Sequence, residues 1–397
     1  MNIDQPLPLL GGLTPRAFMR DYWQRKPLLI RQAIPDFRCH LSIADIKQLA
    51  RREEVESRLI WKDGNDWQMK RGPFSRLPPA RQPGWTLLAQ NVDAHDDGMA
   101  ELMRRFRFIS DARLDDAMIS IATDQGGVGP HFDSYDVFLL QAHGQRHWRI
   151  STQSDLSLEP GLPLKILRDF MPEAEYVLNP GDMLYLPPQV AHDGIALGDC
   201  MTISIGFRAP TLAALARGML DAAGDQVMAR LGDDSGLYAN PPLPGPELAG
   251  TFRDPGTPAT DTPAALPQGL IDAALKAVAR VRFDQALATR FLGQWLTEPS
   301  RAAWFEPEED HPDLTESPPM EGDLVLDRCT RLMYRGKALF INGEVAPAPA
   351  SSLLRKLADE RRLPCNPALA RRLTAGERQM LTDWLAEGWL RYLPAFA

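Results

Sequence analysis

The sequence has little cysteine and no long apolar run, and these two absences exclude several classes of protein. Only four of the 397 residues are cysteines (Cys39, Cys200, Cys329 and Cys365), with no C-x-x-C pair, so neither a disulfide framework nor a structural zinc site is predicted. No stretch of about 18 apolar residues occurs, so no transmembrane helix is predicted. The N-terminal residues also lack the basic and apolar segments of a secretory signal. Together these features predict a cytoplasmic protein with reduced thiols.

An excess of positive charge is also missing. The chain has 44 Lys and Arg against 52 Asp and Glu, a formal net charge of −8 at pH 7. This balance argues against non-specific nucleic-acid binding and is compatible with a basic partner. With 397 residues, 44% of them hydrophobic, the chain is predicted to be globular and to have roughly two to four domains.

Between residues 114 and 207 the sequence alternates short apolar runs with turn residues. This pattern is typical of an antiparallel sandwich or barrel. We expect a hairpin turn between the second and third runs. The predicted strands are 118–122, 137–141, 148–151, 176–178, 183–186 and 201–207.

Beyond Pro210 the pattern changes from strand to helix. Leucine and alanine at helical spacing from Leu212 to Leu220 predict a helix in a core or a dimer interface. Residues 241–267 hold eight of the 35 prolines, which predicts a linker, and helical signals return over 270–296. Short strands and helices after residue 323 predict a small winged-helix-like domain. The expected domain boundaries are 1–209, 210–300 and 301–397.

A candidate metal site follows from two separated motifs. The first, His131-Phe-Asp133, comes after a glycine-rich turn; at the mouth of a strand, side chains two apart point to one face and could bind one metal ion. The second, N-P-G-D-M-L-Y-L-P-P-Q-V-A-H, ends at His192, 59 positions after Asp133. Two histidines and one carboxylate form the facial triad typical of Fe(II) oxygenases, which leaves three coordination positions open. Because no cysteine lies nearby, zinc or an iron–sulfur cluster is less well supported.

A dicarboxylate co-substrate would require a cationic anchor, and two arginines fit that role. Arg146 begins the strand after the expected hairpin, and its guanidinium could hold a carboxylate through two parallel hydrogen bonds. Arg149 is the competing candidate. Ser120, on the strand before the glycine-rich turn, could add a hydroxyl donor.

Four segments together resemble the JmjC and cupin-type Fe(II)/2-oxoglutarate oxygenases, and more closely the bacterial ribosomal oxygenases. They are the H-x-D motif, N-P-G-D-x-L-Y-x-P-P-x-x-x-H, the ending S-I-G-F-R-A-P, and the N-terminal Y-W-Q-R-K-P-L-L-I. The resemblance implies an α+β chain with a double-stranded β-helix (a cupin or JmjC barrel), a helical dimerisation region and a C-terminal winged helix. It implies His131, Asp133 and His192 as the ligands of Fe(II). It also implies that Arg146, assisted by Ser120, binds the distal carboxylate of 2-oxoglutarate.

The resemblance also implies a reaction and its partners. 2-Oxoglutarate and O2 are consumed, succinate and CO2 are released, and C3 of an arginine in large-subunit ribosomal protein number sixteen is hydroxylated by a homodimeric enzyme. An arginine target requires an acidic or aromatic pocket. Candidates near the metal motifs, without assigned roles, are Asp115, Asp116, Tyr135 and Asp193.

Other motifs have simpler interpretations. His143 and His147 flank the expected hairpin turn and are interpreted as a turn residue and a strand-edge residue. The run Gly126–Gly129 lacks the Lys-Ser/Thr ending of a phosphate loop and predicts a backbone turn. Three further histidines are expected at the surface, namely His40, His95 and His311.

Rival functions stay open at this point. A JmjC-type N-methyl-lysine demethylase, or a hydroxylase of another protein, would use the same triad with a different pocket. A non-catalytic cupin scaffold could instead bind nucleic acid through the arginine-rich C-terminal part. The interleaved acids there favour a solvated or protein-docking face at least equally, and a scaffold does not need two histidines and a carboxylate directed at one point. A cupin isomerase, or a dioxygenase that does not use 2-oxoglutarate, would need a fourth ligand, for which no residue has a suitable spacing.

Overall fold

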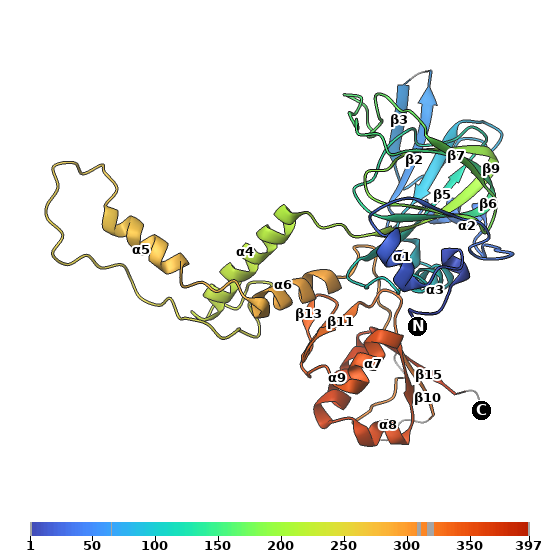
Figure 1. Cartoon of the computed structure of the whole chain (residues 1–397). Helices are drawn as coiled ribbons and strands as arrows, with labels where there is room; N and C mark the ends of the chain where they lie inside the picture. Colours follow the sequence, from blue (N-terminus) through green and yellow to red (C-terminus); the bar gives the residue numbers. More distant parts are fainter. Residues whose placement is uncertain (1, 65, 308–310, 316–320, 396–397) are drawn as a thin grey trace. The chain divides into compact units, whose positions relative to one another are not determined.

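Two compact units make up the chain. The computed structural model describes residues 2–64, 66–307, 311–315 and 321–395. The first unit is Met1–Ala209 with Ser300–Trp304, and the second is Pro210–Pro299 with Phe305–Ala397. Figure 1 shows the first unit mainly in blue and green and the second mainly in yellow to red.

The first unit is built around a nine-stranded sheet (Figure 1). The strands pair in the order β1-β8-β6-β9-β5-β4-β2-β3, with β7 paired to β6, and every one of these pairs is antiparallel. The antiparallel strands predicted between residues 114 and 207 are therefore present. The bounds are β1 Leu28–Ile30, β2 Ser57–Asp63, β3 Asp66–Arg71, β4 Trp85–Ala89, β5 Leu114–Ala122, β6 Val137–Ser151, β7 Ala174–Leu178, β8 Met183–Leu186 and β9 Ala191–Phe207.

Three short helices cover one face of this sheet. The first begins where the Thr14 hydroxyl accepts the Ala17 N–H at 3.1 Å, an N-cap that satisfies one of the free amides of the first turn. Each helix contributes buried side chains, such as Phe18, Ile46 and Met99, to one large apolar core shared with the strands. The helices are α1 Pro15–Asp21, α2 Ile43–Leu49 and α3 Asp97–Arg104.

Alternation along the strands separates a packing face from a site face. From Ala117 on β5 and from Met201 on β9, the odd-numbered residues, such as Ile119 and Ile203, belong to the large core with the helices. Even-numbered residues of the same strands, such as Ser120 and Thr202, therefore lie on the opposite face. A smaller apolar cluster, which includes Leu139 of β6, is separate from the large core.

The expected hairpin between 137–141 and 148–151 is wrong, because β6 is one strand from Val137 to Ser151. An irregularity in its pairing with β9, between Gln141 and Gln145, replaces the turn. Gly144 lies there at φ +62, and a Cβ at this position would lie 2.2 Å from the carbonyl oxygen of Asp199. Only glycine fits both the left-handed backbone and this close approach.

The bulge changes which residues of β6 face the site. Before the bulge, Leu139 belongs to the smaller cluster and Leu140 belongs to the large core, so odd-numbered residues face the smaller cluster. After the bulge, even-numbered Trp148 belongs to the smaller cluster. One extra residue shifts the period of two, so Arg146 points to the same face as Leu139. Without the bulge Arg146 would face the helices.

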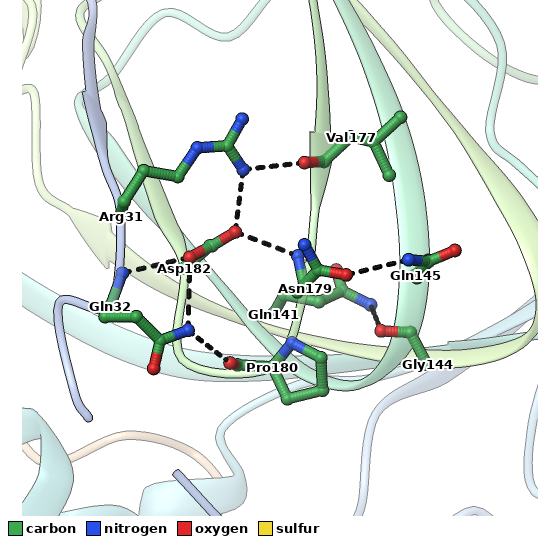
Figure 2. A network of polar contacts seen from close by, with 9 residues as sticks. All are labelled: Arg31, Gln32, Gln141, Gly144, Gln145, Val177, Asn179, Pro180 and Asp182. Carbon is green, nitrogen blue, oxygen red and sulfur yellow. Dashed lines mark hydrogen bonds and ion pairs between the residues drawn. The ribbon is translucent and has the colours of Figure 1, made fainter. Parts of the chain in front are cut away.

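The N-P-G-D segment forms an anchoring turn (Figure 2). The buried carboxylate of Asp182 accepts the backbone N–H of Gln32 at 2.9 Å, that of Asn179 at 3.0 Å, and Nη1 of Arg31 at 2.7 Å. Burial alone would raise the pKa of Asp182, but these hydrogen bonds outweigh it and lower the pKa. This residue of the motif therefore ties the segment after β1 to the turn before β8.

In the described part of the second unit, three helices come first, and two small sheets and three further helices follow, with β14 and β15 after α7 and α9. The helical signals over 270–296 correspond to two helices, α5 and α6, separated at residues 279–284. The proline-rich stretch 241–267, described in full, contains neither helix nor strand, as predicted. The helices are α4 Leu212–Ala229, α5 Gln268–Val278, α6 Gln285–Thr297, α7 Ser352–Glu360, α8 Pro367–Arg372 and α9 Ala375–Ala386.

The strands of the second unit form two three-stranded sheets, in the orders β14-β10-β15 and β11-β12-β13. Their core is continuous with buried leucines of α7 and α9. Among the helices within the described ranges, none is long and apolar enough to cross a membrane. The strands are β10 Gly322–Leu326, β11 Leu332–Arg335, β12 Ala338–Ile341, β13 Glu344–Val345, β14 Arg362–Cys365 and β15 Leu390–Pro394.

Candidate metal centre

The structure brings His131, Asp133 and His192 together, although they are far apart in the sequence. One ligand atom from each lies within 4.8 Å of the others. His131 and His192 form an isolated antiparallel bridge in which each backbone N–H donates to the other's carbonyl, at 2.9 and 2.8 Å. The H-x-D motif therefore lies ahead of β6 and not at the mouth of a regular strand. The backbone bridge places the two histidines together. The strand alternation that the sequence suggested for His131 and Asp133 does not apply, because neither lies in β6.

Hydrogen bonds to the backbone fix both imidazole rings. Nδ1 of His131 lies 2.8 Å from the Gly129 carbonyl, and Nδ1 of His192 lies 2.9 Å from the Val190 carbonyl. A carbonyl only accepts, so each Nδ1 is the protonated nitrogen and each Nε2 keeps its lone pair for a metal ion. Burial first, and then the neighbouring His131, lower the pKa of His192 to about 4. His192 is therefore a neutral ligand at pH 7.

Close packing surrounds the second histidine. The indole of Trp148 on β6 has its ring centroid 5.9 Å from that of His192. A Cβ on Gly194, opposite Trp148 in the β6–β9 register, would lie 2.6 Å from the indole ring. Glycine at this position therefore leaves room for the indole beside the metal centre.

Arg146 is a buried cation that pairs with no carboxylate of the residues the structure describes. It is 4% exposed, and its Nη1 donates a long bond of 3.4 Å to the Ser120 hydroxyl. Its Nε and Nη2 are buried and have no hydrogen-bond partner among the described residues. Buried charges in proteins are normally paired, so two unused parallel donors fit a bidentate carboxylate ligand.

The competing arginine has a different environment. The guanidinium of Arg149 forms a close ion pair with the buried carboxylate of Asp193 and lies 5.8 Å from the ring of Phe170. Its charge is already compensated, so Arg146 fits the role of anion anchor better than Arg149. Asp193, one of the candidates for a substrate pocket, is engaged in this pair.

Two of the other pocket candidates lie together near the triad. Burial first, and then the negative charge of Asp93, raise the pKa of Asp116 to about 7. Burial and the nearby carboxylates of Asp133 and Asp116 raise the pKa of Tyr135. Asp115, the fourth candidate, instead pairs with Arg208 at 3.2 Å.

Comparison with known proteins agrees with this geometry. Residues 101–215 match the JmjC domain family, and residues 280–391 match the ROXA-like winged helix. The chain contains a JmjC domain and a ROXA-like winged helix. The JmjC match includes the triad, Arg146 and Ser120, so all the predicted site residues belong to this domain.

Relatives and solved structures resemble the chain over different lengths. The chain is 39% identical over 224 residues to a probable ribosomal oxygenase of Haemophilus influenzae, and 38% identical over 205 residues to the ribosomal protein uL16 3-hydroxylase of Escherichia coli. These alignments cover 55% and 51% of this chain and 55% of each relative, so the matched segment spans about half the length of these curated relatives. The solved structure of the E. coli ribosomal oxygenase YcfD matches 96% of this chain and 98% of its own, with a TM-score of 0.76 and 28% identity. The predicted barrel fold with a C-terminal winged helix is confirmed.

Sequence reasoning missed several residues of the JmjC domain that support the site. The buried amide of Gln141 accepts the Thr202 hydroxyl at 3.1 Å and donates to the His143 carbonyl at 2.8 Å, which braces the bulge before Arg146. The pattern of apolar runs gives no signal for such a brace, because the bulge itself was interpreted as a hairpin.

The remaining histidines lie outside the triad. His147 on β6 lies 3.0 Å from Glu175 of β7, and His40 lies 2.7 Å from Asp96 at the start of α3. The residues described include no second group of three or more His, Cys, Asp or Glu side chains that could hold a metal ion.

Proposed function

We propose that this protein is an Fe(II)- and 2-oxoglutarate-dependent dioxygenase that hydroxylates C3 of an arginine in a large-subunit ribosomal protein, with succinate and CO2 as co-products. The observation that supports this most directly is the combination, inside one barrel, of a His–Asp–His triad with a buried arginine that has two unused donors. A solved structure of E. coli YcfD contains cobalt and 2-oxoglutarate, which supports the same ligands here.

We assign the metal to His131, Asp133 and His192. Two neutral imidazole nitrogens and one carboxylate oxygen suit Fe(II) and leave open coordination positions. When bound, Fe(II) with 2-oxoglutarate supplies the activation of O2 that C–H hydroxylation requires. The two Nδ1 hydrogen bonds hold the rings in the orientation that binding needs.

We assign the distal carboxylate of 2-oxoglutarate to Arg146, with Ser120 as a second donor. The parallel Nε and Nη2 groups match the two oxygens of a carboxylate, and their burial strengthens the interaction. The bulge at Gly144 is what directs this side chain to the site face.

The substrate arginine would be held by the acidic group of Asp116 and the ring of Tyr135. Asp116 lies in an irregular part of β5, and its Oδ1 would lie 3.2 Å from a Cβ on Gly206, an even-numbered residue of β9. A guanidinium would favour the ionised carboxylate and the face of an aromatic ring. Its arrival would reverse the effect of burial on the pKa of Asp116.

A homodimer is supported by the helices of the second unit. Helix α5 has no buried residue, and Leu270, Ile271, Leu275 and Val278 are each at least 40% exposed. Contiguous apolar surface of this kind is typical of an interface. We expect Leu275→Asp to yield monomers by light scattering, whereas Lys276→Glu on the same helix keeps the wild-type mass.

The decisive experiment measures the mass of ribosomal proteins prepared from cells without this enzyme. They are incubated with the protein, Fe(II), ascorbate and 2-oxoglutarate. One large-subunit protein is expected to gain the mass of one oxygen atom, and fragmentation should place it on an arginine. His131→Ala should abolish the gain, while His147→Ala, at an exposed ion pair on β6, should keep it.

Other results separate the rival functions. Turnover of 2-oxoglutarate without oxygen gain by any ribosomal protein would refute the target and leave the oxygenase assignment. Absence of turnover in protein reconstituted with Fe(II) would refute the oxygenase assignment itself.

A further inference from the structure

A cavity lies within the second unit, between the first two turns of α6 and the hairpin β11–β12. Its volume is about 440 Å³, within the range of small-molecule pockets. Phe340 of β12 forms part of the wall and packs against Gly293 of α6, where a Cβ would lie 2.4 Å from the ring. The small side chains of Ala286 and Ala338 leave the space beside this ring open.

The wall of this cavity contains a buried cation. Arg290 of α6 is only 6% exposed, and its one hydrogen bond to a described residue runs from Nη1 to the Tyr238 carbonyl at a long 3.5 Å. No carboxylate within the described part of the chain pairs with it, and burial alone lowers its pKa. An unpaired buried guanidinium is costly unless a ligand supplies the anion.

The rest of the lining has the same sign. Arg335, at the end of β11, is a second cation in the wall, and no acidic residue lines the cavity although the chain has a net charge of −8. Gln285 and Ala286 belong to the first turn of α6. The N-cap carboxylate of Asp284 accepts the Leu287 N–H at 3.0 Å and keeps its negative charge at this helix end, so the attraction for an anion comes from the two arginines.

We propose that this cavity binds a small organic anion, a phosphate or carboxylate on a compact apolar body. Arg290 and Arg335 hold the anionic group, and the apolar body packs against Phe340 and the neighbouring alanines. The inference does not depend on the oxygenase activity, because every residue in it belongs to the second unit.

The test is calorimetric titration of the full chain, freed of metal by a chelator, with phenyl phosphate. Inorganic phosphate and phenol are titrated separately, because each retains only one part of the ligand. Arg290→Met removes the charge at similar length, and Ala286→Trp fills the cavity from an exposed helical position. Arg146→Met removes the anion site of the JmjC domain and serves as the matched control.

We expect phenyl phosphate to bind more tightly than phosphate or phenol. Arg290→Met should weaken binding at least tenfold, Ala286→Trp should abolish it, and Arg146→Met should leave it unchanged. Three results would each overturn the proposal. They are loss of phenyl phosphate binding only in Arg146→Met, equal binding of phosphate and phenyl phosphate, and no binding of phenyl phosphate at all. A change of oligomeric state in Ala286→Trp, without loss of binding, would also overturn it, because the cavity would then belong to an interface.

Discussion

Replacing Arg146 with methionine should stabilise the protein without co-substrate while abolishing co-substrate binding. The guanidinium is buried, and two of its three nitrogens, Nε and Nη2, lack partners within the described ranges. A residue retained for packing would behave in the opposite way, since truncation of a core side chain destabilises a protein. The sign of the change therefore distinguishes a ligand anchor from a packing residue.

The magnitude follows from the contacts that are lost and the penalties that are removed. Each unsatisfied buried donor costs about 1–3 kcal/mol. Against this stand a long 3.4 Å bond to Ser120 and a guanidinium 5.6 Å from the Trp148 ring, together about 1–2 kcal/mol. Two such donors cost about 2–6 kcal/mol, so we expect the free energy of unfolding to rise by about 1–4 kcal/mol, which at roughly 2–4 °C per kcal/mol is a Tm increase of about 2–16 °C.

Thermal unfolding of chelator-treated protein measures the first effect. The second is measured under anaerobic conditions with Fe(II) and 2-oxoglutarate, where ligand at 100 times its Kd should stabilise the wild type by about 2.7 kcal/mol and the variant not at all. The matched control is Arg149→Met, three residues further along β6. It leaves the Asp193 carboxylate buried and unpaired, so it should lower stability by about 1–3 kcal/mol.

Two results would refute this reasoning. A fall in the Tm of Arg146→Met comparable to that of Arg149→Met would mean that Arg146 contributes to packing. Full stabilisation of Arg146→Met by 2-oxoglutarate would mean that the distal carboxylate binds elsewhere.

Three further changes test other parts of the first unit. Gly144→Ala forces a Cβ against the Asp199 carbonyl at positive φ. We expect the free energy of unfolding in denaturant to fall by about 2–3 kcal/mol and 2-oxoglutarate to bind at least tenfold more weakly. Unchanged binding would show that the bulge does not position Arg146. Burial raises the pKa of Asp93 from 3.8 to about 6, so the folded state loses stability as pH rises between these values. The free energy of unfolding of Asp93→Asn should therefore exceed that of the wild type by about 2–3 kcal/mol at pH ~7.5 and equal it near pH ~4. A difference that does not depend on pH would contradict this. Asp182→Ala leaves two backbone N–H groups without their acceptor and should cost about 2–4 kcal/mol in urea unfolding, with a smaller loss counting against the anchoring turn.

The sequence predicted those features that depend on local pattern. The runs of β5, β8 and β9 were visible because apolar residues and turn residues alternate there. The triad was visible because its residue types are rare together and two of them are only two positions apart. Arg146 and Ser120 were expected to bind one carboxylate together; Nη1 of Arg146 lies 3.4 Å from the Ser120 hydroxyl, and their role in binding stays a prediction.

The bulge in β6 was invisible for a physical reason. A glycine between two apolar runs predicts a turn, and a single residue in the left-handed region can either reverse a chain or insert a bulge. The choice depends on β9, whose Asp199 carbonyl approaches Gly144 from more than 50 positions away in the sequence. The pairing with β9, and not the local sequence pattern, therefore determines that β6 continues through a bulge and does not reverse in a turn.

The two faces of the sheet explain how the protein tolerates a destabilising site. From Ala117 on β5 and from Met201 on β9, the odd-numbered residues belong to the large core shared with the three N-terminal helices, and this core contains none of the three metal ligands. The opposite face holds His192, Ser120 and Arg146, and Nε and Nη2 of Arg146 have no hydrogen-bond partner among the described residues. Because the period of two places these sets on opposite faces, changes to the site need not alter the core that holds the strands together. The bulge at Gly144 links the core and the site, because it determines the face of the sheet on which Arg146 lies.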